Sequence, residues 1–162
     1  NIALYYSVEH KIIDIDKRSI TGSSLIDRNI DVPKNREQNN ETPNTYVPGR
    51  NTIFLAHALS QAEVFNADEV YIGAMAEDAA YPDCKKGFID AFQNVFNQTY
   101  PCNIIAPFLE MSKKDIVELG KKLGVPYNMT FSCYDPPKPN QHCGLCDACK
   151  RRISGFENGT HM

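Results

Sequence analysis

The chain lacks tryptophan, a membrane-spanning apolar segment and a recognisable signal peptide. A bilayer-spanning helix needs about 20 consecutive apolar residues, and no segment of the 162 residues approaches that length. Residues 1–6 carry no basic flank and no cleavage pattern. The composition, 42% hydrophobic and 23% charged, is ordinary for a globular protein. We therefore expect a cytoplasmic protein with no membrane partner.

The chain also lacks an excess of positive charge. The net charge is −3, so the surface as a whole does not favour nucleic acid as a partner. Lys150, Arg151 and Arg152 form the only cluster of three basic residues. We interpret them as the solvated end of a helix. The alternative is a patch that follows phosphates.

Four of the six cysteines lie close together near the C-terminus: Cys133, Cys143, Cys146 and Cys149. Two overlapping C-x-x-C steps with a fourth thiol upstream are typical of a tetrahedral structural zinc site, which leaves no open position for catalysis. Cysteine pairs of this spacing in a reducing compartment favour metal over disulfides, which remain the alternative. His142 adjoins Cys143, and adjacent ligands strain a tetrahedral site. We therefore interpret His142 as a bystander.

Strand and helix patterns alternate along the chain. Isoleucine-rich residues 9–16 predict a buried strand, and residues 17–45 predict a polar loop region. Ser112 and Asp115 form a capping-box pattern, and Gly124 ends the helix that they begin. Further strands are expected at 69–73 and 103–106, and helices at 53–65, 85–97 and 112–123. This order predicts an α/β fold with a parallel sheet covered by helices on both faces.

Two loops are expected at the carboxyl ends of the strands, where such sheets bind ligands. The first places Gly49, Arg50 and Asn51 at a helix N-terminus. The helix dipole, the free backbone N–H groups and the arginine together favour binding of a phosphate. The alternative is a proline–glycine turn with an exposed arginine.

The second loop, residues 75–84, contains the carboxylates Glu77, Asp78 and Asp83 and the ring of Tyr81. Such carboxylates can bind Mg²⁺ or the N–H edge of a purine-like base, and the tyrosine can stack on that base. The alternative is N-capping by Asp83 with solvated acids.

A lysine pair, Lys113 and Lys114, opens the third predicted helix. A cation at a helix N-terminus opposes the helix dipole. A bound polyphosphate would reverse that cost. The alternative is an exposed pair with no ligand.

Taken in order, residues 43–51 (PNTYVPGRN), 81–85 (YPDCK), 132–134 (SCY) and 143–149 (CGLCDAC) resemble the 7-cyano-7-deazaguanine synthase family. The resemblance covers most of residues 9–156. It implies a Rossmann-like sheet of the ATP-pyrophosphatase type over residues 1–130 and a small zinc-binding subdomain over residues 131–158. Residues 159–162 have the composition of a cloning remnant.

The resemblance implies an enzyme that converts 7-carboxy-7-deazaguanine, ammonia and ATP with Mg²⁺ into 7-cyano-7-deazaguanine. The carboxylate is adenylated, ammonia displaces AMP to give an amide, and a second adenylation precedes loss of AMP to the nitrile. A homodimer is also implied. Phe88, Phe92 and Phe96 offer an aromatic helix face for it, unless they pack in the core.

The same resemblance assigns roles to residues at matching positions. Arg50 and Lys113 are expected to be catalytic, with Lys113 contacting phosphate. The remaining assignments are nucleotide binding by Gly49, Arg50 and Asn51, substrate binding by Asp78, Tyr81, Pro82 and Asp83, and zinc binding by Cys133, Cys143, Cys146 and Cys149.

Two departures from the family pattern affect the expected activity. The family's Ser-Gly-Gly-x-Asp-Ser phosphate loop belongs before Asn1. We therefore expect the first strand and its loop to be missing, and the isolated chain to be inactive without them. They would be supplied by the parent gene or by a separate N-terminal fragment.

The second departure lies in the loop predicted to bind substrate. Lys85 stands where the family usually has arginine, and the usual glycine before Tyr81 is absent. Lysine is a point charge rather than a bidentate fork. An alternative function is thus a related enzyme that acts on another carboxylate, such as a protein or a modified base. A non-enzymatic alternative is a zinc ribbon that binds nucleic acid through residues 150–152.

Overall fold

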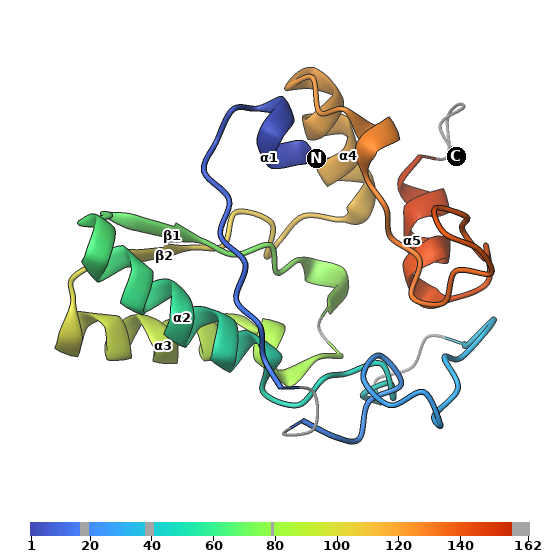
Figure 1. Cartoon of the computed structure of the whole chain (residues 1–162), viewed down its shortest axis with the longest axis horizontal. Helices are drawn as coiled ribbons and strands as arrows, with labels where there is room; N and C mark the ends of the chain where they lie inside the picture. Colours follow the sequence, from blue (N-terminus) through green and yellow to red (C-terminus); the bar gives the residue numbers. More distant parts are fainter. Residues whose placement is uncertain (17–19, 38–40, 79, 157–162) are drawn as a thin grey trace.

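The computed structural model describes residues 1–16, 20–37, 41–78 and 80–156 (Figure 1). Its longer elements are helices α2 (Arg50–Phe65), α3 (Lys86–Thr99), α4 (Lys113–Lys122) and α5 (Asp147–Gly155), and strands β1 (Glu69–Tyr71) and β2 (Asn103–Ile105). The shorter ones are α1 (Ile2–Tyr5) and the 3₁₀ turns η2 (Ala76–Asp78), η3 (Pro82–Cys84) and η4 (Tyr127–Met129). Residues 157–162 of the predicted zinc subdomain and cloning remnant lie outside the described part.

The two strands pair in parallel, as predicted, with Val70 opposite Ile104. Successive side chains of a strand point to opposite faces of the sheet. Ile104 faces a core that it shares with Leu55 of α2 and Phe96 of α3. Figure 1 shows α2 and α3 together on this side of the sheet.

The opposite face of the sheet differs from the prediction of helices on both faces. Tyr71, which points to that face, is 66% exposed.

The aromatic residues of α3 pack in the core, because Phe96 is fully buried and Phe88 and Phe92 pack against the same cluster. This outcome agrees with core packing, the alternative use for these residues.

The predicted strand over residues 9–16 is wrong. The structure has no regular element there, and Ile12 is 77% exposed. A strand is stable only when a neighbour satisfies its backbone groups, and β1 and β2 pair with each other instead. Lys11 ties this segment to α2, with its ammonium 3.9 Å from the centre of the Phe65 ring.

The helix predictions from residue 50 to residue 124 are confirmed to within a few residues at their ends. Gly49 precedes α2 with a φ of 66°, in the left-handed region that favours glycine. The capping box is formed, because the Ser112 side chain accepts from the Asp115 amide and the Asp115 carboxylate accepts from the Ser112 amide. Gly124, with a φ of 71°, follows α4.

Helices α4 and α5 form a second packed pair, shown in orange and red in Figure 1. They approach closely at Gly155, where an added Cβ would lie 2.9 Å from Lys113 Cγ and 3.1 Å from Val117 Cγ2. This contact holds the start of α4 beside the C-terminal helix. Within the described part of the chain, the helices fall short of the length and apolar character that crossing a membrane requires.

Candidate functional site

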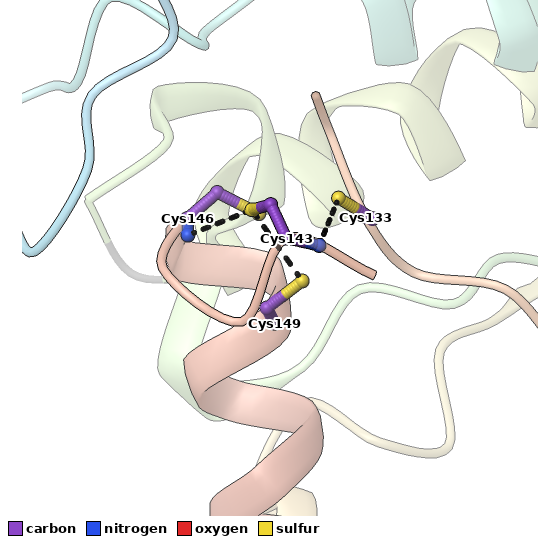
Figure 2. A group of neighbouring side chains, drawn as sticks. All are labelled: Cys133, Cys143, Cys146 and Cys149. Carbon is purple, nitrogen blue, oxygen red and sulfur yellow. Dashed lines mark hydrogen bonds between the residues drawn. The ribbon is translucent and has the colours of Figure 1, made fainter. Parts of the chain in front are cut away.

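The four clustered cysteines come together as the sequence predicts. Their sulfur atoms all lie within 4.8 Å of one another, and Cys143 and Cys149 are 3.9 Å apart. Cys146 lies at the N-cap position of α5, Cys149 lies in the first turn of that helix, and Cys133 approaches from the irregular segment before the proline-rich loop (Figure 2). Together they could hold a metal ion.

Backbone N–H groups point at these sulfur atoms. The Cys143 amide donates to Cys133 Sγ at 3.3 Å, and the Leu145 and Cys146 amides donate to Cys143 Sγ at 3.4 Å. Burial alone would raise the pKa of the Cys143 thiol, but these backbone donors lower that pKa to about 6. The loop therefore favours a thiolate at Cys143, which is the form that binds metals, whereas burial raises the pKa values of Cys133 and Cys149.

The other candidate ligands lie outside the cluster. His142 Nε2 accepts from the Ser132 amide at 3.5 Å, and its ring lies 4.5 Å from the Phe131 ring. This agrees with its interpretation as a bystander. Cys84 and Cys102 are buried elsewhere, and all six cysteines are free thiols.

Residues 32–36, which the sequence analysis placed in a loop without a role, pack over the cysteine cluster. Lys34 Nζ lies 3.4 Å from Cys143 Sγ and 2.7 Å from an Asp135 carboxylate oxygen. Arg36 donates to the buried carboxylate of Asp147 at 3.1 Å. Because these contacts span more than 100 residues, local sequence pattern gives no signal for them.

The two predicted loops contact each other at the N-terminus of α2. Asn51 donates from its backbone amide to Asp83 Oδ2 at 3.0 Å, and from its side chain to the Asp83 carbonyl at 2.9 Å. Both residues are buried. Asp83 thus provides the negative charge that a helix N-terminus favours, and it joins α2 to η3.

Tyr81 lies close to the contact between the two predicted loops. Its hydroxyl is 3.1 Å from Thr45 Oγ1, and both residues are buried. Tyr134, next to Cys133 of the cysteine cluster, lies beside it, and burial together with Tyr81 raises the pKa of Tyr134 to about 12. Pro82 is exposed. The stretches around residues 45, 81 and 134 therefore meet in space.

An ion pair joins the cysteine segment to the second loop. Arg151 Nη1 of α5 lies 2.6 Å from Asp78 Oδ1 of η2, and their side chains are only 10% and 20% exposed. The cysteine segment therefore lies near loop 75–84. Asp78 and Arg151 line a cavity of about 270 Å³ with Lys113, Ser132 and Tyr134. Arg50, which is half-buried, does not line this cavity.

The interpretation of residues 150–152 as a solvated helix end is wrong for two of the three residues. Arg151 is held by Asp78, and Arg152 is 8% exposed and donates to Thr130 Oγ1 at 2.8 Å and the Tyr127 carbonyl at 3.1 Å. Cys149, Arg152 and Phe156 recur at helical spacing, and this period is the signal that indicates a buried face. The burial also removes the basis for nucleic-acid binding through this triplet.

The fold and the site define an α/β protein in which a four-cysteine cluster that could hold a metal ion lies beside a ligand-sized cavity. The family model described as "Queuosine biosynthesis protein QueC" matches residues 1–160. The chain belongs to this family, which confirms the resemblance found in the sequence.

Relatives named "7-cyano-7-deazaguanine synthase" are similar over most of the chain. The relative from Trichodesmium erythraeum (strain IMS101) is 46% identical over 162 residues, covering 93% of this chain and 72% of the relative. The relative from Nostoc sp. (strain PCC 7120 / SAG 25.82 / UTEX 2576) is 44% identical over 160 residues, covering 92% and 69%. The relative from Rickettsia akari (strain Hartford) is 43% identical over 164 residues, covering 94% and 72%.

Proposed function

We propose that this protein takes part in ATP-dependent conversion of 7-carboxy-7-deazaguanine and ammonia into 7-cyano-7-deazaguanine. The observation that carries the proposal is the convergence of three stretches that the sequence resemblance singled out. Asn51 binds Asp83, and Tyr81 lies beside Tyr134. Asp78 and Arg151, which flank these stretches, bind each other. The names of the relatives agree with this function.

The fold that we propose for the complete protein is a Rossmann-like sheet of the ATP-pyrophosphatase type. Strands β1 and β2 with helices α2 and α3 supply a parallel unit of such a sheet. The cavity lined by Gly73 and Met75 follows the carboxyl end of β1, which is where open parallel sheets bind ligands.

The metal that we propose for the cysteine cluster is zinc. Four thiolates about 2.3 Å from a tetrahedral zinc lie about 3.8 Å apart, and Cys143 Sγ and Cys149 Sγ are 3.9 Å apart. The N–H donors and Lys34 offset the negative charge of four thiolates. With four protein ligands the zinc is structural, and it fixes the start of α5.

The chemistry of the proposed reaction depends on leaving groups. A carboxylate oxygen leaves poorly until it carries an adenylyl group, after which ammonia can displace AMP and give an amide. A second adenylation, now on the amide oxygen, allows loss of AMP to the nitrile. The protein's part is to position the reactants and neutralise charge. Mg²⁺, when bound with ATP, neutralises part of the phosphate charge.

In this proposal Lys113, the first residue of α4, contacts phosphate. Arg50 at the start of α2 is proposed to act on the nucleotide with Gly49. Asn51 and Asp83 are engaged with each other, so we propose that they shape the loops on which Asp78, Tyr81 and Pro82 meet the base. A homodimer and a separate N-terminal fragment remain predictions.

The proposal is tested by incubating the protein with Mg-ATP, ammonia and 7-carboxy-7-deazaguanine, and following AMP and the cyano product by mass spectrometry. The isolated chain and the product of the complete natural gene are assayed in parallel, which also tests the predicted inactivity of residues 1–162. Cyano product from the complete protein supports the proposal. ATP turnover that another carboxylate stimulates, with no cyano product, favours the related enzyme instead.

A further inference from the structure

The cavity between η2, α4 and α5 is built around a buried guanidinium. It has a volume of about 270 Å³ and is lined by Asp78, Lys113, Ser132, Tyr134 and Arg151, with Gly73, Met75 and Ala148. Its size is near the lower end of small-ligand pockets. Tyr134, Met75 and Ala148 supply apolar wall, and the other side chains supply charge and hydrogen-bonding groups.

Arg151 uses few of its hydrogen-bond donors. A guanidinium carries five N–H groups, but among the described residues the Arg151 guanidinium donates one hydrogen bond, from Nη1 to Asp78 Oδ1 at 2.6 Å. Its Nε is buried without a partner. The side chain is nine-tenths buried, with 10% exposed. Arg151 lines the cavity, so a ligand bound there can accept hydrogen bonds from guanidinium donors that Asp78 does not engage.

The charges that line the cavity fit one carboxylate better than a polyphosphate. Arg151 and Lys113 are cations, and Asp78 is an anion. A single carboxylate would bring one negative charge to the Arg151 guanidinium, whose planar fork matches carboxylate geometry. A triphosphate carries several negative charges, and Asp78 would repel it. The charge and the open donors therefore indicate a monovalent carboxylate.

We propose that Arg151 receives the carboxylate of the substrate base in this cavity and selects for bases that carry it. The inference rests on the proposed function, because it takes the carboxylated deazaguanine as the ligand. Arg151 thus supplies, from α5, the planar fork that Lys85 cannot supply from the substrate loop. Asp78 holds the guanidinium in place from the opposite side.

The test compares binding of 7-carboxy-7-deazaguanine with binding of 7-deazaguanine, which lacks the carboxylate, by calorimetry on the metal-loaded protein. We expect the wild-type protein to prefer the carboxylated base, and Arg151→Gln to reduce that preference by about 10- to 100-fold, as for loss of a charge-assisted hydrogen bond. The matched control is Lys150→Gln, which removes the same charge from the same helix at a residue that does not line the cavity.

A second variant keeps the inference falsifiable if Arg151→Gln fails to fold. Arg151→Lys retains a cation beside Asp78, and we expect it to fold, as melting temperature and metal content will show, while losing part of the carboxylate preference. An unchanged preference in either folded variant would overturn the inference. So would a wild-type protein that binds both bases equally.

Two further outcomes separate the possible failures. If folded Arg151 variants lose ATP affinity and keep the carboxylate preference, Arg151 binds phosphate and the inference is overturned. In the other outcome, the complete wild-type protein prefers the carboxylated base and folded Arg151 variants lose that preference, while the wild type forms no nitrile. In that case the inference holds and the proposed reaction fails.

Discussion

Asp83 accepts a hydrogen bond from the backbone amide of Asn51 at 3.0 Å, inside the protein and at the first turn of α2. The Asn51 side chain donates a second hydrogen bond, to the Asp83 carbonyl. The pair joins a helix N-terminus to the loop that carries Tyr81. Sequence pattern placed the two residues on different ligand-binding loops, and the structure brings them together as one anchor between those loops.

We predict that Asp83→Ala destabilises the protein by about 1–3 kcal/mol, because the buried Asn51 amide loses its acceptor. Urea unfolding followed by circular dichroism measures this. The control is Asp90→Ala, which breaks the exposed pair of Asp90 with Lys86 and costs about 0.5 kcal/mol or less. Equal stability of the two variants would contradict the role of the Asn51–Asp83 contact as an anchor between the two loops.

We predict that Cys146→Ser releases the metal and unfolds α5, because Cys146 is buried in the cluster directly before that helix. Structural zinc contributes to folding directly. Metal content and melting temperature are the measurements, and a chelator should have the same effect on the wild-type protein. The control, His142→Ala, removes a neighbour that lies outside the cluster and should keep the metal. Full metal content in Cys146→Ser would refute the assignment.

Glycine-to-alanine substitutions in α3 and α4 should have opposite effects on the stability of the protein. An alanine in a helix is usually favoured by about 0.5–1 kcal/mol. Nothing lies within 4 Å of a Cβ at Gly87, so Gly87→Ala should stabilise. A Cβ at Gly120 would clash with the Tyr127 hydroxyl, which donates to the Val117 carbonyl at 3.1 Å.

Gly120→Ala should therefore destabilise by about 1–3 kcal/mol, which is typical of overpacking. Denaturant midpoints of the two variants provide the comparison. If both variants gain stability, Tyr127 does not pack against α4 as described.

The capping box of α4 predicts a pH dependence of stability. Hydrogen bonds from the Ser112 side chain and backbone lower the pKa of Asp115 below its usual value of 3.8. A group with a depressed folded-state pKa stabilises the fold above its unfolded pKa, and that stability is lost as pH falls through the folded pKa. Asp115→Asn should thus be less stable than wild type near neutral pH.

The difference between the two proteins should shrink as the pH falls below about 4. Denaturant unfolding at several pH values measures it, and Asp90→Asn controls for the general effect of removing an exposed aspartate charge. A difference that stays constant down to the acid range would exclude the charged capping box.

Local patterns predicted the features that depend on neighbouring residues. The apolar period of α2, the capping box at Ser112 and the spacing of the cysteines each specify structure within a few turns of chain. Residues 9–16 show the limit of this reasoning, because an isoleucine-rich pattern indicates a strand only when a partner strand pairs with it. No local signal identifies that partner.

The contacts that build the site are mostly long-range. Arg36 reaches Asp147 across 111 residues and Arg151 reaches Asp78 across 73. A basic triplet such as residues 150–152 predicts a solvated helix end. Only the helical spacing of Cys149, Arg152 and Phe156 indicates that Arg152 lies on a buried face. The resemblance could name Asp78 as a site residue, but the guanidinium that faces it could be found only in three dimensions.

The central claim is that the protein replaces a carboxylate by a nitrile at the expense of ATP. Its most direct test supplies the complete protein with isotopically labelled ammonia, 7-carboxy-7-deazaguanine and Mg-ATP, and measures the product and AMP together. We predict that the label appears in the nitrile nitrogen and that two AMP are formed for each nitrile. Consumption of ATP with no labelled nitrile would contradict the claim.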